Sequence, residues 1–231
     1  MSSMYTSIFY KEILVILTII SQSDPFSIDK GLSPIEAYNH YFNNAGGEEM
    51  QIKYSGTILE CIKGDIVSQK DIMAIVNAAN AQLLPGGGVA GAIHRSSGPE
   101  LAMACRSLAP IRPGDAVITP GFNLPNRYVI HTLGPRYGVD KPEALILTAS
   151  YQNSLRIAEV HDVDSLAFPA ISTGVFGYPV KEAAQIAIQS IFKKISQLNK
   201  IKMIRFVLFN LDDLQIYEDT LNVMYGTIHG K

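Results

Sequence analysis

The chain has 231 residues, of which 47% are hydrophobic and 17% charged, so it can form one core with an appended segment or two small domains. Its formal net charge of −2 offers no general attraction for nucleic acid or an anionic membrane surface, and we expect neither as a partner. The two cysteines, Cys61 and Cys105, lack paired spacing and are too few for a disulfide framework. We therefore expect buried thiols in a monomeric protein of the reducing cytoplasm, with the nucleus as an alternative.

The first 49 residues differ in character from the remainder. Residues 13–20 form an apolar run that is well short of the roughly 20 residues that span a bilayer, so we predict no membrane span. Lys11 before the run and polar residues after it suit a signal peptide, but Glu12 and the lack of a cleavage site favour a docking helix or strand. Residues 43–49 have linker composition. We place the boundary there, with an extension over 1–49 and the main domain over 50–231.

Beyond this linker, apolar strands alternate with helical patterns. Strands are expected at 51–53, 57–62, 74–76, 115–119, 128–133, 166–170 and 203–209. Helices are expected at 89–108, where Pro99 must bend or interrupt the helix, and at 142–160, 180–198 and 211–223. This alternation indicates an α/β domain whose sheet is at least partly parallel.

Residues 77–95 carry the strongest functional signal. Asn77 and Asn80 follow an apolar strand, and the glycines at 86–88 precede the start of a helix. Glycines let backbone N–H groups approach an anion closely, and the N-terminus of a helix adds the positive end of its dipole. The pattern predicts a pocket for a phosphate-bearing ligand, with amide side chains at its edge.

Two common phosphate-binding motifs do not fit this stretch. Gly86, Gly88 and Gly91 have the G-x-G-x-x-G spacing of a dinucleotide fingerprint, but nine residues separate the strand from the first glycine, where that motif needs a tight turn. In addition, Asp115 begins the next strand, whereas the fingerprint needs an acidic residue at its end. No Lys-Ser or Lys-Thr follows the glycines, which excludes a P-loop. We therefore set aside a nicotinamide dehydrogenase.

Two further segments suggest the same ligand. Residues 171–179 form a second loop of small residues between a strand and a helix, with Pro179 well placed to start that helix. Because ligands bind at the carboxyl ends of parallel strands, the two loops could close on one diphosphate from opposite sides. Asp65, at the exit of the strand 57–62, could accept a hydrogen bond from an exocyclic amine such as that of adenine. By itself, Gly-Asp is usually a turn.

These motifs occur together, and in this order, in the macrodomain family. The chain resembles that family from about residue 50 to residue 223, and it is most similar to MacroD-type proteins and bacterial O-acetyl-ADP-ribose deacetylases. The segments that carry the resemblance are Gly64-Asp65-Ile66, Asn77-Ala78-Ala79-Asn80, Gly86-Gly87-Gly88-Val89, His131-Thr132-Leu133-Gly134-Pro135 and Ile171-Ser172-Thr173-Gly174-Val175-Phe176-Gly177.

The resemblance implies a three-layer α/β/α sandwich around a mixed, mostly six-stranded sheet that binds ADP-ribose. Adenine would lie at Asp65, the diphosphate between the two glycine loops, and the distal ribose against Phe176 and Asn80. The residues that the resemblance assigns to the ligand are Asp65, Ile66, Asn77, Asn80, Gly87, Gly88, Val89, Ser172, Thr173, Gly174, Val175, Phe176, Phe209 and Asn210. Phe209 and Asn210 are the loosest of these assignments.

Ala90 is where the chain departs from many MacroD-type hydrolases, which carry an aspartate at this position to orient or activate water. A methyl group can do neither. Other macrodomains, including viral ones with Gly-Val-Ala-Gly, also carry alanine and are associated with hydrolysis by a water that the ligand's own phosphate holds. The resemblance thus implies a hydrolase of mono-ADP-ribosylated protein or O-acetyl-ADP-ribose, with Asn80 as its catalytic residue. A non-catalytic ADP-ribose reader and an ADP-ribose-1″-phosphate phosphatase remain alternatives.

Neither of the two histidines nearest these motifs is expected to be catalytic. A helix that begins at Val89 turns His94 away from the glycine loop, and His131 lies in the middle of a strand, where a packed, hydrogen-bonded histidine is expected. No His/Cys cluster has metal-ligand spacing, so we predict no zinc and no other cofactor. The sequence also contains no nucleophile–base pair that would indicate a covalent intermediate.

Overall fold

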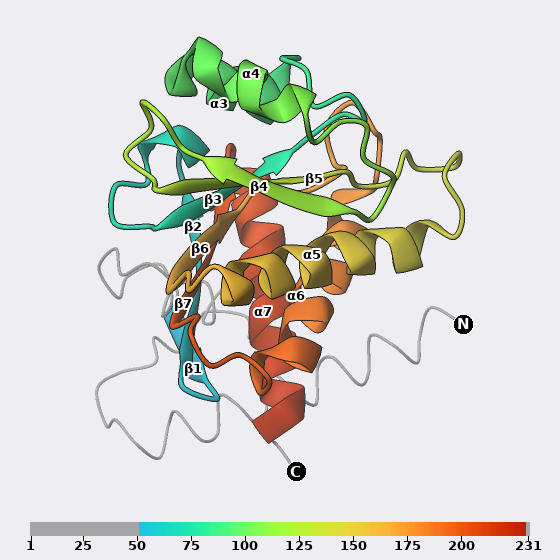
Figure 1. Ribbon diagram of the computed structural model, residues 1–231. Coiled ribbons are helices and arrows are strands. Elements are labelled where there is room, and N and C mark those ends of the chain that lie inside the picture. The colour runs from blue at the N-terminus through green and yellow to red at the C-terminus, as the bar shows by residue number, and fades with distance from the viewer. Residues whose placement is uncertain (1–50, 230–231) are drawn as a thin grey trace. The chain divides into compact units, whose positions relative to one another are not determined.

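The computed structural model describes residues 51–229, and the predicted N-terminal extension and its boundary lie outside this range. Seven strands form one sheet in the order β1-β2-β7-β6-β3-β5-β4 (Figure 1). The five inner strands are parallel, while β1 and β4 run antiparallel at the two edges. The strands are β1 (Gln51–Tyr54), β2 (Thr57–Lys63), β3 (Ala74–Ala78), β4 (Ala116–Pro120), β5 (Tyr128–Thr132), β6 (Ser165–Phe168) and β7 (Met203–Leu208).

The α/β sandwich that the sequence predicts is confirmed, with seven strands where the resemblance implies about six. Each of the seven strands lies where the apolar pattern predicts one. β6 ends at Phe168, before the predicted limit at Ala170, because Pro169 has no N–H to donate to a neighbouring strand.

Helices cover both faces of the sheet, which gives the three layers visible in Figure 1. The first face carries α3 (Gly88–Ser97) and α4 (Pro99–Arg106), and the second carries α5 (Glu143–Val160), α6 (Val180–Ile195) and α7 (Leu211–His229). A 3-10 turn, η1 (Ile66–Ser68), follows β2. The break between α3 and α4 falls at Gly98, whose φ of +89° favours glycine, and Pro99 begins α4, as predicted.

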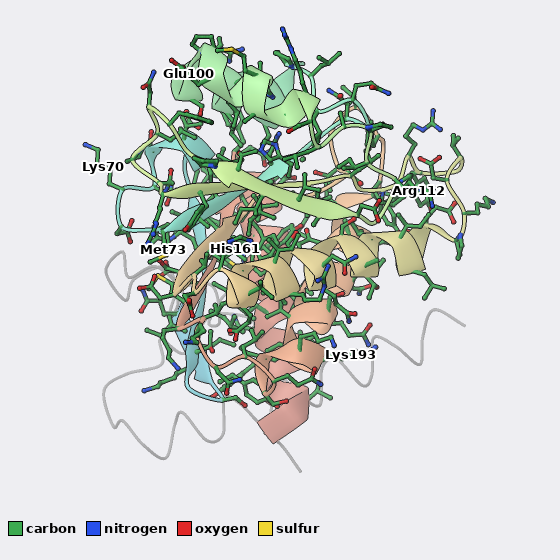
Figure 2. The ribbon with its side chains drawn as sticks, in the orientation of Figure 1. Lys70, Met73, Glu100, Arg112, His161 and Lys193 are labelled. Atoms are coloured by element: carbon green, nitrogen blue, oxygen red, sulfur yellow. The ribbon has the colours of Figure 1, made fainter. Side chains whose placement is uncertain are left out.

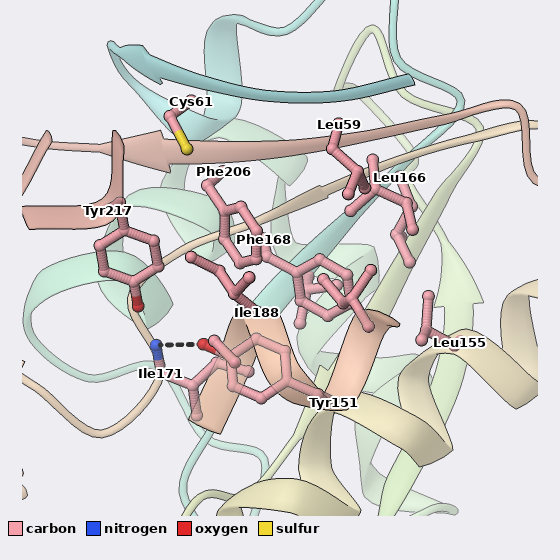
Figure 3. Close-up of a cluster of buried hydrophobic side chains, with 14 of the residues drawn as sticks. Leu59, Cys61, Tyr151, Leu155, Leu166, Phe168, Ile171, Ile188, Phe206 and Tyr217 are labelled. Atoms are coloured by element: carbon pink, nitrogen blue, oxygen red, sulfur yellow. Dashed lines mark hydrogen bonds between the residues drawn. The ribbon is translucent and has the colours of Figure 1, made fainter. Parts of the chain in front are cut away.

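Each layer boundary contains its own apolar core, because successive side chains of a strand point to opposite faces of the sheet. Ala74 and Val76 belong to the cluster under α5, α6 and α7, whereas Ile75 between them belongs to the cluster under α3 and α4. Figure 3 shows the first of these clusters, where Tyr151, Phe168 and Phe206 pack ring against ring.

The cysteines are part of these cores. Cys61 and Cys105 are free and buried, as the sequence predicts. Burial raises the pKa of the Cys105 thiol to about 11 and that of Cys61 still further. Both groups therefore stay protonated at neutral pH, which makes them poor nucleophiles and poor metal ligands.

Candidate functional site

The carboxyl ends of the five parallel strands meet at one edge of the sheet, and the predicted site segments all lie at or near that edge. Residues 64–66 follow β2, Phe209 and Asn210 follow β7, the loop 171–177 follows β6, and residues 77–88 include the end of β3 and the loop after it. β2 and β3 are three strand spacings apart, or about 14 Å at about 4.8 Å per spacing. The site is therefore elongated, and its parts lie in a row.

The glycine loop after β3 exposes the N-terminus of α3. Gly87 is the N-cap and makes no side-chain capping bond, and Gly88 begins the helix with φ +53°, a left-handed conformation that favours glycine. Gly91 packs so tightly on the loop that a Cβ there would lie 2.2 Å from the Gly86 carbonyl oxygen. The first backbone N–H groups of the helix thus have no intrahelical acceptor and are presented on exposed glycines, an arrangement that suits an anion.

The loop after β6 presents a second set of backbone N–H groups. Among residues 51–229, the N–H groups of Gly174, Val175 and Phe176 donate to no protein acceptor, and Val175 is fully exposed. Successive unpaired N–H groups of this kind form a concave anion site. The two loops that the sequence predicts for a diphosphate thus follow neighbouring strands, β6 and β3.

The base of this second loop is held firmly. Ser172 has φ +70° and is buried, and its carbonyl accepts from the N–H of Tyr178 at 3.0 Å. The N–H of Ile171 donates to the buried Tyr151 hydroxyl at 3.4 Å (Figure 3). Gly134, after β5, approaches the loop so closely that a Cβ there would lie 2.1 Å from the Ser172 Oγ. The hydroxyl and the backbone N–H of Thr173 both donate to the Ala170 carbonyl, at 3.0 and 3.4 Å, so Thr173 differs from residues 174–176, whose N–H groups are unpaired.

Asn80 has a structural task that the sequence did not indicate. Its Oδ1 accepts from the backbone N–H groups of Gln82 at 3.2 Å and Leu84 at 3.1 Å, and its Nδ2 donates to the Leu84 carbonyl at 2.7 Å. The side chain therefore folds the turn 80–84 that leads to the glycines, and it retains one amide hydrogen for a ligand. The tendency of asparagine to bond to backbone two residues on was the signal that could have shown this role.

Asn77 lies within the sheet, not at its open edge. It is 1% exposed, and its Nδ2 lies 3.1 Å from the Nδ1 of His131 on the neighbouring strand β5. The hydroxyl of Thr119 lies 2.9 Å from the other ring nitrogen, so His131 is the packed, hydrogen-bonded histidine that the sequence predicts. Burial, together with nearby His94, lowers the pKa of His131 to about 3, which keeps the ring neutral. Asn77 thus joins β3 to β5 through its Nδ2, while its Oδ1 has no partner within residues 51–229, and its place in the ligand set stays a prediction.

His94 and Ala90 occupy the buried side of α3. They are 7% and 6% exposed, and a spacing of four residues places them one helical turn apart. Neither ring nitrogen of His94 has a hydrogen-bond partner in the described part of the chain, and burial lowers the pKa of the ring. His94 is thus a buried residue of the core under α3, in agreement with the prediction that it is turned away from the glycine loop.

The opposite end of the site carries Asp65 and an exposed aromatic ring. Asp65 is exposed and caps η1, with its Oδ1 accepting from the N–H of Val67 at 3.1 Å. Phe209 is 86% exposed. The end of β7 lies beside the end of β2, because the Gly64 N–H donates to the Leu208 carbonyl at 2.9 Å. Asn210 is engaged with α7, because its Oδ1 accepts from the N–H of Asp213 at 2.7 Å. An acceptor beside an exposed ring is an arrangement that suits a nucleobase.

A buried ionic network supports this end, and sequence reasoning missed it. Arg205 on β7 donates to the fully buried Glu60 on β2 and forms two bonds of 2.9 and 2.7 Å to Asp71. It also donates at 2.8 Å to Gln69, whose Nε2 donates at 2.8 Å to the Asp65 carbonyl. These bonds lower the pKa of Asp71. The available signal was a pair of charged residues inside the otherwise apolar strands β2 and β7.

The described part of the chain lacks both a metal-binding cluster and a membrane-spanning helix. Within residues 51–229, no group of three or more His, Cys, Asp or Glu side chains could hold a metal ion. In the same range, no helix is long and apolar enough to cross a membrane.

The fold and the site define a class of α/β/α protein whose sheet edge is built for an elongated, phosphate-bearing ligand. The family model of the Macro domain matches residues 76–187. The chain is 53% identical over 150 residues to a Macro domain-containing protein of Ralstonia nicotianae, which covers 64% of this chain and 86% of that protein. It is 46% identical over 167 residues to a protein of Klebsiella pneumoniae named O-acetyl-ADP-ribose deacetylase, which covers 70% of this chain and 95% of that one.

A solved structure gives the same result. A macrodomain of Oceanobacillus iheyensis with ADP is similar with a TM-score of 0.74 and 39% identity, over 78% of this chain and 98% of that one. The chain belongs to the Macro domain family.

Proposed function

We propose that this macrodomain binds ADP-ribose along the sheet edge and hydrolyses a bond at the distal ribose of mono-ADP-ribosylated protein or O-acetyl-ADP-ribose. The observation that carries the proposal is the pair of facing anion sites: the bare N-terminus of α3 and the unpaired N–H groups of residues 174–176, on adjacent strands. A diphosphate is the group that two such sites can share. The solved structure with ADP and the relative named as a deacetylase support the same ligand.

The order of the site components supports one direction for the ligand. Adenine lies at the β2–β7 end, with its exocyclic amine at Asp65 and its ring beside Phe209. The diphosphate lies between the two glycine loops, and the distal ribose lies beyond it, near Asn80 and Phe176. Asn80 supports this direction because its side chain lies next to the glycine loop, with Nδ2 3.8 Å from the position of a Cβ at Gly86.

The chemistry is attack by water. At C1″ of the distal ribose it breaks the bond to the side-chain carboxylate of the modified protein, which leaves as the free acid. At the acyl carbon it breaks the ester bond, and the acid and the ribose hydroxyl are the products; in both cases the protons of the water end on the products or in solvent. Ala90 offers no proton acceptor, and His94 lies buried on the core side of α3, so this chain supplies no general base from α3 to the ribose. The rate enhancement comes from holding the diphosphate and ribose in place, with the remaining amide hydrogen of Asn80 on a ribose hydroxyl and a water held by the ligand's own phosphate. The reaction needs no cofactor.

A second candidate function rests on the same alanine. With a methyl group in place of a carboxylate, the protein could recognise ADP-ribose without cleaving it. The two candidates share the binding site and differ in turnover, so one experiment separates them.

Single-turnover release of ADP-ribose from an automodified mono-ADP-ribosyltransferase is that experiment, with excess macrodomain and the substrate alone as control. Release above the control, at a rate that saturates with macrodomain, supports the hydrolase. Binding of ADP-ribose without any release leaves the reader function and removes the hydrolase.

Calorimetric titration with ADP-ribose and with AMP tests the binding mode itself. ADP-ribose should bind at least about tenfold more tightly, because AMP lacks the second phosphate and the distal ribose, and tenfold corresponds to about 1.4 kcal/mol. Equal affinities would contradict a site that extends past the diphosphate.

A further inference from the structure

Two arginines, Arg95 and Arg112, flank the loop that carries Asn80, and within residues 51–229 neither guanidinium forms an ion pair; the Asp115 carboxylate accepts only from the backbone N–H of Arg112, at 2.9 Å. Arg112 lies in the segment between α4 and β4, with backbone hydrogen bonds on both sides of it. The N–H of Ile111 donates to the Ala81 carbonyl at 2.9 Å, and the N–H of Gly114 donates to the Leu133 carbonyl at 2.7 Å. Arg112 is therefore tied to the loop after β3 and to the end of β5, and Figure 2 shows it on the side of the domain where the loops after these strands lie.

Arg95 reaches the other end of the same loop. It belongs to the last turn of α3, but a Cβ built on Gly91 would lie 2.9 Å from the Arg95 Nη1 and 2.2 Å from the Gly86 carbonyl oxygen. The guanidinium is therefore folded back along the helix to the glycine loop, in the direction in which helical side chains lean. Among residues 51–229, neither the Arg95 nor the Arg112 guanidinium forms an ion pair or a hydrogen bond.

The position of the Arg95 guanidinium is not the one that the helix dipole favours for a cation. A cation in the last turn of a helix is stabilised when it stays near the negative end of the dipole. The Arg95 guanidinium instead lies beside Gly91, in the first turn of α3, where the dipole is positive. An anion beside the first turn of α3, next to the glycine loop, would offset this unfavourable interaction.

We propose that Arg95 and Arg112 form an acceptor rim that selects substrates in which the ADP-ribosylated residue lies within an acidic peptide segment. The inference rests on the proposed function, because it assigns the rim to the part of the substrate attached to the distal ribose. The turn that begins at Asn80 contacts the segments of both arginines. The Ala81 carbonyl accepts from the N–H of Ile111, next to Arg112, and the Asn80 Nδ2 lies 3.8 Å from a Cβ position on Gly86, whose carbonyl lies on the same side of Gly91 as the Arg95 guanidinium. The scissile bond near Asn80 and the rim are therefore neighbours. Acidic side chains on either side of the modified residue then meet one guanidinium each.

A peptide fits this rim better than a nucleic acid does. Strong binding to nucleic acid needs several phosphate contacts, and its strength follows the number of cations that the protein contributes. The rim contributes two, and the whole chain has a net charge of −2. Leu84, which is 55% exposed in the same loop, adds an apolar surface suited to a peptide side chain.

The test compares two peptides that carry a single ADP-ribosylated glutamate, flanked in one by Asp and Glu and in the other by Asn and Gln. Release and peptide affinity are measured for the full chain and for Arg95→Gln, Arg112→Gln and the double variant. We expect about a fivefold preference for the acidic peptide at low salt, since an exposed ion pair is worth about 0.2 to 1 kcal/mol. In each single variant the preference should fall to about two- to threefold, because one ion pair remains. It should vanish in the double variant. It should also vanish for the full chain at about 1 M salt, where charges are screened within about 3 Å.

Arg156→Gln is the matched control. Arg156 is also exposed and lacks an ion-pair partner among the described residues, but it lies near the end of α5 that leads to the amino end of β6, at the opposite edge of the sheet. This variant should keep the full preference. Free ADP-ribose is titrated into every variant, and its affinity should be unchanged.

The remaining outcomes overturn the rim. Equal release rates and equal affinities for the two peptides would refute the rim and leave the proposed function in place. An equal loss of affinity for free ADP-ribose in the arginine variants would assign the arginines to the diphosphate. Faster release from an ADP-ribosylated oligonucleotide than from the acidic peptide would make the ligand a nucleic acid. If no substrate is cleaved, the hydrolase fails, and the peptide affinities alone then support or overturn the rim.

Discussion

Gly87→Ala tests where the diphosphate lies without disturbing the fold. A Cβ built on Gly87 meets no atom within 4 Å, and the residue has φ −84°, which any L-residue adopts. The protein itself therefore accepts the methyl group. Alanine is a poorer N-cap than glycine but restricts the unfolded chain, and these effects oppose each other, so we expect the free energy of unfolding to change by less than about 1 kcal/mol.

Binding should respond very differently. If the diphosphate lies against the Gly87 backbone, the methyl group occupies the space of a phosphate oxygen, and the ligand must shift away from the N–H groups of α3. We expect the affinity for ADP-ribose to fall at least about tenfold, or about 1.4 kcal/mol. Gly174→Ala makes the same test on the other loop, because a Cβ there also meets nothing within 4 Å.

Calorimetric titration with ADP-ribose, paired with urea unfolding, separates the two effects. The matched control is Gly226→Ala on α7, where a Cβ also meets open space. It should leave the affinity unchanged and stabilise the helix by about 0.5 to 1 kcal/mol. An unchanged affinity in both Gly87→Ala and Gly174→Ala would refute the placement of the diphosphate between the two loops.

Three further predictions concern the polar side chains of Asn80, Arg205 and His131. Asn80→Ala should lower ADP-ribose release more than ADP-ribose affinity, because it removes the amide hydrogen at the ribose, whereas the loss of its bonds to the turn 80–84 affects only one of the two phosphate loops; single-turnover kinetics and calorimetry compare the two. Arg205→Met should lower the free energy of unfolding by about 3 to 5 kcal/mol in urea, because it leaves the carboxylate of Glu60 buried without its cation. His131 should make stability depend on pH: its folded pKa of about 3 lies below the ordinary 6.5, so only the unfolded chain takes up a proton between these values. Stability should be full above about pH 6.5 and fall by about 1.4 kcal/mol per pH unit below it, measured by urea unfolding from pH 7 to pH 5.

Each of these predictions has a contrary result. An Asn80→Ala variant with wild-type release would remove Asn80 from the mechanism. Replacing Arg205 together with Glu60, as Arg205→Met with Glu60→Leu, should recover much of the lost stability; a double variant as unstable as the single one would show that the lost charge pairing is not the cause. His131→Gln should flatten the pH dependence, and an unchanged slope would assign it to other groups, with His94 the next to examine because burial lowers its pKa in the same direction.

Much of the fold could be predicted from the sequence because strand and helix periods are local properties. All seven strands lie within a few residues of their predicted positions, since a run of apolar, β-branched residues between turn residues has few alternatives. The ends were less certain. α7 continues to His229, past the predicted end at Val223, because neither a proline nor a capping residue after Val223 stops the helix.

The site divides in the same way. The glycines of both loops could be identified because their task, a close backbone approach to an anion, depends on the residue itself. The burial of Asn77 against His131 and the link from Arg205 to Asp65 could not, because each depends on which strands become neighbours.

The sequence by itself therefore determined the chemistry at residues 77–95: an amide, three glycines and a helix start, with Ala90 in place of a carboxylate. The tertiary structure decided what that stretch faces. The order β2-β7-β6-β3 places Asp65 and Phe209 at one end of the row and the second loop between them and the glycines. The physical reason is that parallel strands present all their carboxyl ends at one edge, while their order is set by burying both faces of the sheet under helices distant in the sequence.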